Sequence, residues 1–269
     1  MCRTLSVSRS GFYRWLKGRS SHRSQANAQL SEQILRIFHN SHRTYGSPRI
    51  TTALRHQGIH CNKKRVARLM RLSGWVSKMK RRFKCTTRSR HGRPVADHLA
   101  RGIAVKAPDQ IWRSDITYLW TREGWLYLAV FLDAFSRKVV GWAMRHRLTD
   151  QLVLDAFSQA LTNRRPGAGL IAHSDRGSQY CSRSFKELLH QNSFRQSMSA
   201  TGNCYDNALV ESFFGTLKTE WVYHESYRDR DEARRSVFKY IDMFYNRVRI
   251  HTALGGFSPE QFEQLQSVA

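Results

Sequence analysis

The sequence changes character near residue 100, and this change limits the folds that are open to it. Residues 1–100 carry 23 Lys and Arg against 2 Asp and Glu, whereas residues 101–269 carry 22 against 18. In the first part apolar residues recur with helical spacing, and in the second they form runs rich in aromatic and β-branched residues, as strands do. We therefore expect a basic helical region followed by a domain built on a sheet.

The basic region predicts helices over residues 29–38, 49–57 and 63–73. Ser31 can cap the first of them. Its apolar face consists of Leu30, Ile34, Leu35 and Phe38, with Ile37 beside them. Residues 5–17 are typical of the second half of a separate helix-turn-helix.

The last two helices are five residues apart, which is the pattern of a helix-turn-helix. The third helix is expected to turn Val66, Leu69 and Met70 inward. Its outward residues are basic: Lys63, Lys64, Arg65, Arg68 and Arg71. Because almost no acidic residues offset this charge, we interpret this face as a DNA-binding surface rather than as the solvated face of a helical bundle.

A basic segment follows the helices. Residues 77–93 are rich in Lys and Arg, among them Lys80, Arg81 and Arg82, and contain no Asp or Glu. Such a run is not expected to pack into a core. We predict a linker that lies along DNA phosphates and makes binding depend on salt.

The rear part is predicted to be an α/β domain. Strands are expected over 110–120, 125–133, 138–144, 169–174 and 194–199, and helices over 149–163, 182–191 and 206–223. The first three strands should form an antiparallel meander, because only short polar turns separate them. This order predicts a mixed sheet flanked by helices. Beyond residue 221 the pattern predicts only a helix over 234–244.

Three carboxylates stand out in this domain. Asp115 interrupts an otherwise apolar strand, Asp175 follows the carboxyl end of another strand, and Glu211 lies in an aromatic helix. Each has a simple alternative: Asp115 could pair with Arg113, Asp175 could belong to a turn, and Glu211 could be an exposed helix charge. If the three converge, their repulsion requires a cation, and Mg²⁺ prefers such oxygen ligands.

Two Mg²⁺ ions held in this way can activate a water or a 3′-hydroxyl and stabilise the leaving oxygen of a phosphodiester. Lys218 lies two helical turns after Glu211, about 10 Å further along the same face, where it could hold a phosphate. This chemistry suits the polyanionic partner that the net charge of +25 predicts.

Longer motifs around these carboxylates resemble a known family. The matching stretches are Trp112–Tyr118, His173–Tyr180 and Gly202–Phe214, and 35 residues separate Asp175 from Glu211. Further matches are Tyr245–Arg247, His251–Leu254, Ser258-Pro259 and the region from Tyr45 to Trp75. The chain is thereby similar to the OrfB-type transposases of the insertion-sequence-three family, within the superfamily of DDE transposases and retroviral integrases.

The resemblance implies an RNase H-like fold and DNA cleavage at the ends of a mobile element, followed by transfer of the freed 3′-hydroxyl. By position, Asp115, Asp175 and Glu211 would be the catalytic metal ligands for two Mg²⁺ ions, for which Mn²⁺ could substitute. The partners would be terminal-repeat and target DNA, further copies of the chain and a protein from the element's first reading frame. An RNase H-like nuclease or resolvase, or a degenerate DNA-binding regulator, remains the alternative.

These patterns predict five segments. They are a partial helix-turn-helix (1–20), a helix-turn-helix domain (21–76), a basic linker (77–107), an RNase H-like core (108–225) and a C-terminal helical DNA-contacting extension (226–269). In the extension we expect Arg247, Arg249 and His251 to contact phosphates.

Several other residues receive structural roles. We assign Asp133, the nearest competitor for a metal, to turn or sheet structure, and His173 to a positional role. Trp112, Tyr118 and Trp142 are assigned to the core rather than to base-stacking surfaces.

Other classes of protein are disfavoured. The longest strongly apolar run, residues 125–132, is too short to span a membrane, and the N-terminus lacks the apolar stretch of a secretory signal. The five cysteines are scattered without a close pair, which is typical of reduced thiols. We therefore expect a cytoplasmic, nucleoid-associated protein.

Overall fold

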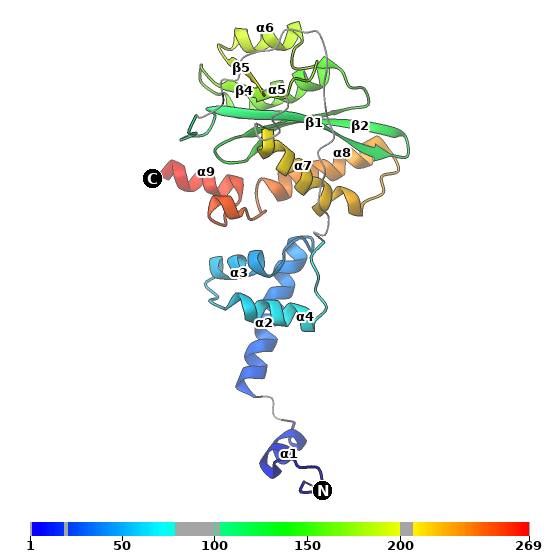
Figure 1. The fold of residues 1–269 in the computed structure, drawn as a ribbon, viewed down its shortest axis with the longest axis vertical. Coiled ribbons are helices and arrows are strands. Elements are labelled where there is room, and N and C mark those ends of the chain that lie inside the picture. The colour runs from blue at the N-terminus through cyan, green and yellow to red at the C-terminus, as the bar shows by residue number, and fades with distance from the viewer. Residues whose placement is uncertain (1, 19–20, 79–99, 101–102, 200–206, 269) are drawn as a thin grey trace. The chain divides into compact units, whose positions relative to one another are not determined.

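The computed structural model describes residues 2–18, 21–78, 100, 103–199 and 207–268 (Figure 1). The chain forms two compact units, Met1–Ser77 and Lys78–Ala269. The predicted phosphate contacts Lys80, Arg81 and Arg82 lie outside the described residues, as does most of the predicted linker. Among the described helices, none has the length and apolar character needed to cross a membrane.

The first unit is helical. It contains α1 (Arg9–Leu16), α2 (His22–Asn40), α3 (Ser47–His56) and α4 (Lys63–Leu72). Helices α2, α3 and α4 pack on one another through a small apolar core: Leu30, Ile34, Ile37, Phe38, Ile50, Leu54, Val66, Leu69 and Met70. The inward face predicted for α4 is confirmed.

Helix α2 begins well before its predicted start. Ser21 caps it by accepting a hydrogen bond from the backbone N–H of Ser24 at 3.2 Å, so the prediction of Ser31 as the cap is wrong. The first turns are polar and exposed, so they carry no apolar periodicity from which a helix could be recognised. Ile37 is buried in the core, and Leu35 is only partly buried.

The second unit is built on a mixed sheet of five strands in the order β3-β2-β1-β4-β5. The strands are β1 (Ile111–Thr121), β2 (Gly124–Asp133), β3 (Val139–Arg145), β4 (Ile171–Ser174) and β5 (Arg195–Met198). The first three form the predicted antiparallel meander, and β4 and β5 join it in parallel pairing. The predicted fold class is confirmed.

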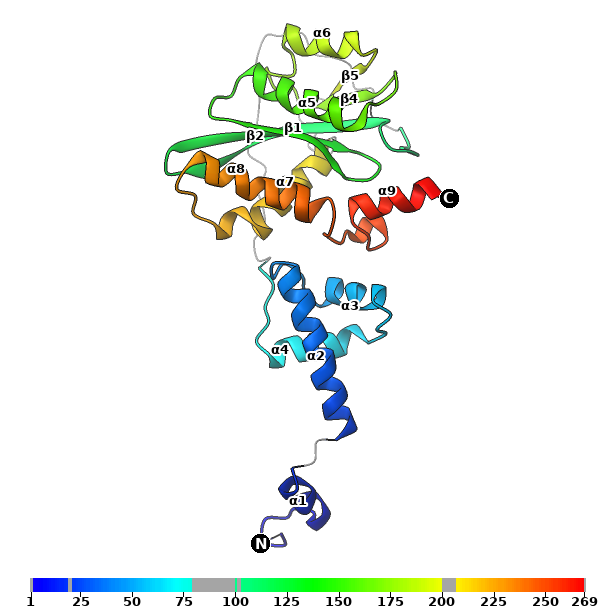
Figure 2. The ribbon, with the colours of Figure 1, turned by 180° about the vertical axis from the view of Figure 1, so that it is seen from behind.

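Helices cover both faces of this sheet (Figures 1 and 2). One face is covered by α5 (Asp150–Arg164) and α6 (Arg183–Gln191), whose Phe157 and Phe185 pack edge to face at 5.4 Å. Trp112 of β1 contacts Phe157 in the same core. Close packing of α5 on β3 requires Gly141, because a Cβ there would lie 2.3 Å from the Ala156 carbonyl oxygen.

The opposite face carries the C-terminal elements. They are α7 (Ala208–Glu220), η2 (Val222–His224), α8 (Arg230–Phe238), the π-helical segment η3 (Lys239–Tyr245), η4 (Thr252–Leu254) and α9 (Pro259–Val268). The helix predicted over 234–244 therefore spans the end of α8 and most of η3. Asn246 holds the end of η3 to the edge strand β3, because its side chain both accepts from and donates to the backbone of Val139.

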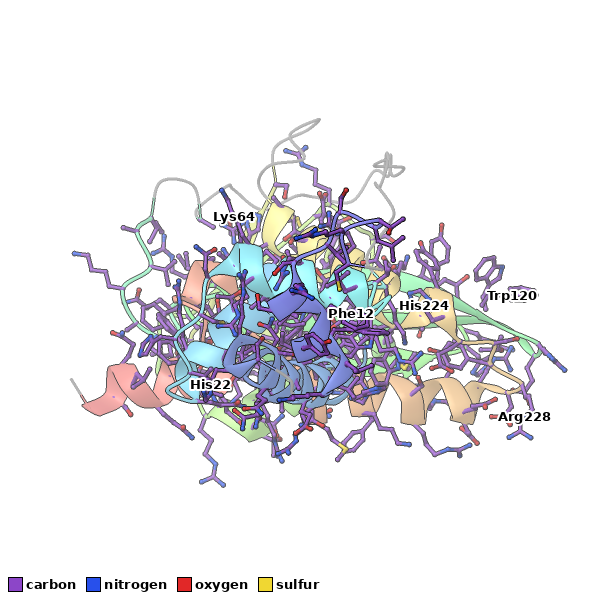
Figure 3. All side chains as sticks on the ribbon, turned by 90° about the horizontal axis from the view of Figure 1, so that it is seen from below. Phe12, His22, Lys64, Trp120, His224 and Arg228 are labelled. Carbon is purple, nitrogen blue, oxygen red and sulfur yellow. The ribbon has the colours of Figure 1, made fainter. Side chains whose placement is uncertain are left out.

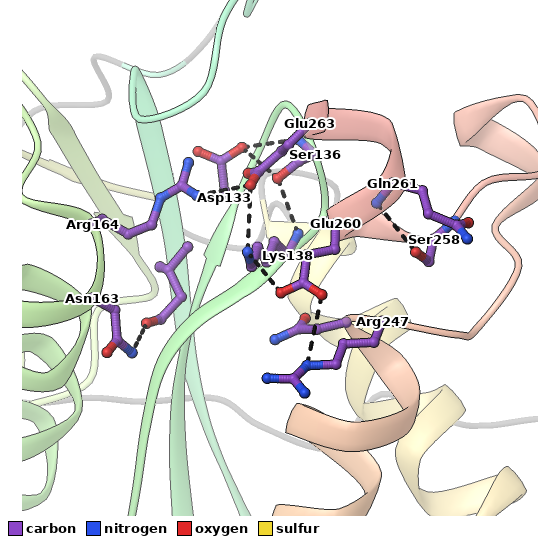
Figure 4. A network of polar contacts seen from close by, with 12 residues as sticks. Asp133, Ser136, Lys138, Asn163, Arg164, Arg247, Ser258, Glu260, Gln261 and Glu263 are labelled. Atoms are coloured by element: carbon purple, nitrogen blue, oxygen red, sulfur yellow. Dashed lines mark hydrogen bonds and ion pairs between the residues drawn. The ribbon is translucent and has the colours of Figure 1, made fainter. Parts of the chain in front are cut away.

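A polar network anchors α9 to the sheet domain (Figure 4). Lys138 Nζ lies 3.3 Å from Glu260 and 3.5 Å from Glu263, and Arg164 Nη1 donates to Glu263 at 2.8 Å. Arg164 also forms an ion pair with Asp109 at 2.9 Å. The C-terminal elements are thus an integral part of the second unit.

Candidate active site

Asp115 and Asp175 lie next to each other at the point where β4 ends. The parallel strands β1 and β4 pair Ser114 with Ser174, so the two aspartates occupy the next position along each strand. Neighbouring strands are about 4.8 Å apart, which brings the two residues together although 59 residues separate them in sequence. The predicted convergence of these two carboxylates follows directly from this register.

Each aspartate is oriented by a backbone N–H group close to it in sequence. Asp115 Oδ1 accepts from Ile116 at 2.7 Å, and Asp175 Oδ1 accepts from Gly177 at 2.9 Å. A Cβ on Gly177 would lie 3.0 Å from Asp175 Oδ1, so glycine lets the loop fold closely over the carboxylate. The hydroxyls of Ser114 and the buried Tyr180 lie 2.7 Å apart, and this contact connects β1 to the segment that follows Asp175.

Helix α7 brings Glu211 to the same region. Asn207, just before the helix, donates from Nδ2 to the backbone oxygen of Ser114 at 3.0 Å, which fixes the start of α7 beside Asp115. Glu211 follows one helical turn later and is exposed. Two further turns along, Lys218 Nζ lies 5.0 Å from the centre of the Tyr118 ring, so α7 follows β1 in the same direction.

The pKa of Asp115 reflects the charged groups around it. Burial raises the pKa of Asp115 to about 8, with further upward contributions from the charges of Asp175 and Glu211. The Ile116 N–H and the Lys218 ammonium act in the opposite direction. Burial likewise lowers the pKa of Lys218, against the attraction of Asp115. A cation placed among the carboxylates would remove most of this repulsion.

The residues suit a hard cation chemically, although they do not form a closed cage. In the described part of the chain, no three His, Cys, Asp or Glu side chains are gathered into a metal-binding group. Asn207 is 5% exposed, and among the described residues its Oδ1 has no hydrogen-bond partner. Since the Nδ2 group must face the Ser114 carbonyl, this buried oxygen is an acceptor in need of a donor or a cation. Carboxylate and amide oxygens are the ligands that Mg²⁺ prefers.

Asp133 and His173 have the structural surroundings that were predicted for them. Asp133 is fully buried and accepts from the backbone N–H groups of Asp109, Phe135 and Ser136, as a turn residue does. His173 is buried between β4 and β5, where its ring nitrogens lie 2.9 Å from Ser197 Oγ and 3.3 Å from Ser199 Oγ.

The predicted DNA contacts on α4 differ in accessibility. Lys63, Lys64 and Arg71 are exposed (Lys64 is labelled in Figure 3). Arg68 is partly buried. Arg65 is held against α2, because Nε and Nη2 both donate to Asn27 Oδ1, at 3.0 and 2.8 Å.

Two predicted phosphate contacts must be corrected. Arg249 is only 4% exposed and donates from Nε and Nη2 to both carboxylate oxygens of Glu220, each at 2.8 Å. The guanidinium therefore faces the interior and holds the end of α7. Its neighbour Arg247 is exposed, with Glu260 3.7 Å away. His251 is also buried, beside Arg249, and so is equally unavailable to phosphate.

The aromatic assignments were partly wrong. Trp112 is fully buried as predicted, and Trp142 is partly buried with its indole N–H donating to Asp242 at 3.0 Å. Tyr118, however, is 52% exposed. Strand β4 ends opposite Ser114, so none of the described strands pairs with the outer part of β1 on that side. The alternation of apolar and polar residues along β1 does not indicate where the adjacent strand β4 ends, so the exposure of Tyr118 could not be predicted from it.

Comparisons with known proteins agree with this architecture. Family models for an integrase core domain match residues 105–204 and 211–266, and one for an HTH-like domain matches residues 25–83. The chain is 46% identical to the transposase InsF for insertion sequence IS3A of Escherichia coli K12, over 98% of this chain and 92% of that protein. It is 44% identical to a 31 kDa protein of insertion element IS600 from Shigella sonnei, over 98% and 97% of the two chains.

A solved structure shares the fold at low sequence identity. In the simian T-cell lymphotropic virus intasome in complex with PP2A regulatory subunit B56 gamma, the matched chain is 18% identical, with a TM-score of 0.50. The match covers 86% of this chain and 74% of that one.

Proposed function

Because the chain belongs to the insertion-sequence-three family of transposases, we propose that it cleaves DNA at the ends of its element and joins the freed 3′-hydroxyl to target DNA with two Mg²⁺ ions. Two observations support this proposal: the register of β1 and β4 brings Asp115 beside Asp175, and the charges of Glu211 and Lys218 act on the Asp115 carboxyl group. Such a group suits phosphodiester chemistry and has no evident structural purpose.

The roles of the side chains follow from their positions. Asp115, Asp175 and Glu211 would hold the ions. When bound, magnesium supplies charge stabilisation for the attacking and leaving oxygens of the phosphodiester. Lys218 would bind a phosphate next to the carboxylates, a role supported by the action of its charge on Asp115. The hydroxyl pair of Ser114 and Tyr180 keeps β1 and the Asp175 loop in fixed register.

The helical unit supplies DNA binding in this proposal. Exposed cations on α4, in a region with almost no acidic residues, suit the phosphates of a duplex. A second copy of the chain on the other element end, and a protein from the first reading frame, are further partners that we propose for end recognition. The intasome relationship supports the fold alone and leaves both partners to experiment.

The test uses a labelled duplex that joins the element's own end sequence to flanking DNA. The full-length chain is incubated with this duplex, a target plasmid and Mg²⁺, and the products are separated and sequenced. We expect strand cleavage at the element end and new joints between its 3′ end and the plasmid. The variants Asp115→Asn, Asp175→Asn and Glu211→Gln should give neither product while binding the duplex normally.

Asp231→Asn provides the matched control, because it makes the same chemical change at a carboxylate on α8 that is 71% exposed and is not among the proposed ligands. Near-normal cleavage by any of the three site variants would falsify the metal-ligand assignment. Nicked DNA without joints would instead indicate the nuclease alternative, and binding without any cleavage would indicate the regulator.

A further inference from the structure

Three large aromatic side chains are exposed together on the hairpin formed by β1 and β2. Tyr118, Trp120 and Trp125, here called the hairpin aromatic cluster, are 52%, 59% and 46% exposed. Trp125 pairs with Trp120 across the strands, and its ring lies 4.8 Å from that of Trp120 and 5.0 Å from that of Tyr118. Figure 3 shows the Trp120 side chain projecting beyond the strand ribbons.

The end of β4 leaves these rings uncovered, but it does not explain why three large aromatic residues stand at this position. Aromatic rings contribute most to stability when they are buried, and grouped apolar rings at a surface typically mark a binding site. The hairpin itself is firmly held: Arg122 N–H donates to the Tyr227 carbonyl at 3.1 Å, and Arg230 donates to the Glu123 carbonyl at 2.7 Å. The rings therefore stand on a rigid support, as a preorganised binding surface requires.

The cluster lies further along β1 from the candidate active site. Tyr118 follows Asp115 by three residues, about 10 Å, and Trp120 follows by five, about 17 Å, and because these offsets are odd both rings leave the strand on the face opposite to Asp115. Lys218 connects the two regions, since its ammonium lies over the Tyr118 ring and also acts on the charge of Asp115. A strand whose scissile phosphate lies at the carboxylates would reach the rings with nucleotides about three to five positions away, at about 3.4 Å per nucleotide.

The chemistry of the cluster favours nucleic-acid bases. Proteins that bind single strands combine aromatic faces, on which bases stack, with cations that neutralise the adjoining phosphates. Lys218 and the exposed Arg122 supply such cations at the two ends of the cluster. Bases inside a duplex are stacked on one another, so only an unpaired or extruded base can reach these rings.

We propose that the hairpin aromatic cluster stacks against unpaired bases of the DNA strand, about three to five nucleotides from the scissile phosphate. This inference rests on the proposed function for the position of the strand. It assigns to Trp120 and Trp125 a role in holding an opened DNA end, and it makes Lys218 the link between base stacking and phosphate binding.

The experiment measures stacking separately from cleavage. The fluorescent base 2-aminopurine is placed at the fourth nucleotide from the cleavage position, in a fully paired duplex and in a forked duplex with that region unpaired. The full-length chain should quench the probe in the forked duplex. Trp120→Leu should abolish the quenching and weaken binding to the fork by about 5- to 150-fold, the loss expected for one stacked base.

Two further variants make the result specific. Trp120→Phe retains an aromatic face and should keep most of the quenching. Phe238→Leu removes an aromatic side chain that is 48% exposed at the end of α8, and it should behave as the unaltered chain does. If Trp120 were needed only for folding, Trp120→Leu and Trp120→Phe would both lower the melting temperature. If Trp120 stacks on a base, the two variants differ in quenching, which is lost in Trp120→Leu and kept in Trp120→Phe.

The outcomes distinguish this inference from the proposed function. Normal cleavage with equal quenching by Trp120→Leu and the unaltered chain would overturn the inference and leave the function intact. Quenching without any cleavage by the unaltered chain would support stacking and count against the function. If Trp120→Leu instead turned a dimer into a monomer in sedimentation, with quenching unchanged, the cluster would be a protein interface and the inference wrong.

Discussion

Replacing Arg249 with methionine should destabilise the catalytic unit by about 3–5 kcal/mol, the usual cost of breaking a buried ion pair. The side chains of Glu220 and Arg249 are 0% and 5% exposed. Two guanidinium N–H groups, and the Tyr240 hydroxyl at 3.1 Å, donate to the Glu220 carboxylate. Without Arg249 that carboxylate loses both guanidinium donors and the positive charge that balances it, so a buried charge is left uncompensated.

A double variant tests this reasoning further. Removing both charges, with Glu220→Leu and Arg249→Met together, should be less damaging than Arg249→Met alone, because no lone buried charge remains. The double-mutant cycle should give a coupling energy of about 0.5–3 kcal/mol. An exposed pair would give about 0–1 kcal/mol.

The assay is urea unfolding of the full chain, followed by tryptophan fluorescence, together with DNA affinity at several salt concentrations. Arg247→Met is the control: its side chain is 65% exposed, so it should change stability by no more than about 0.5 kcal/mol. The reasoning is refuted if Arg249→Met unfolds at the same urea concentration as the unaltered chain but binds DNA more weakly with a shallower salt dependence. Arg249 would then be a phosphate contact after all.

Three other predictions concern packing, DNA binding and the metal site. Gly141→Ala should cost about 1–3 kcal/mol in urea unfolding because the new methyl overlaps the α5 backbone, whereas Gly167→Ala, which meets nothing within 4 Å, should be neutral; equal effects would contradict this. In a titration with duplex DNA, Lys64→Ala and Arg71→Ala should each make the negative slope of log affinity against log salt shallower by about 0.9. An unchanged slope would place DNA binding elsewhere. Because burial, Asp175 and Glu211 raise the pKa of Asp115 from 3.8 to about 8, the metal-free fold should lose stability as the pH rises between these values. Mg²⁺ should then raise the melting temperature more at about pH 8 than at about pH 6; the same pattern in Asp115→Asn would contradict this.

Local patterns predicted most of the elements of the second unit. Strands β1, β2 and β3 were placed within one or two residues, because each is a run of aromatic and β-branched residues closed by a polar turn. Helix α2 was cut short at its N-terminus, since its first turns are exposed and polar and leave no periodic signal. Its beginning is set by the Ser21 cap, which is a single hydrogen bond.

The candidate site could be identified because its residues are exceptions to their surroundings. Asp115 stands in an apolar strand and Asp175 follows one, and an isolated carboxylate in such a place requires a reason. Asn207 was not predicted, because nothing in the sequence distinguishes an asparagine that bonds to β1 from one that caps a helix. Its role depends on the Ser114 carbonyl, which is 93 residues away.

By itself, the sequence determined the two regions of the chain and the strand meander, and it singled out three carboxylates, because each of these features is recognised from the residues immediately around it. The tertiary structure alone decided that Arg249 is buried against Glu220 and that Tyr118 and Trp120 are exposed. Both outcomes depend on distant segments: α7 covers Arg249, whereas β4 ends before it reaches Tyr118. Charge and periodicity indicate whether a side chain is apolar or polar and on which face of an element it lies. Whether it is buried depends on which distant segment packs against that face.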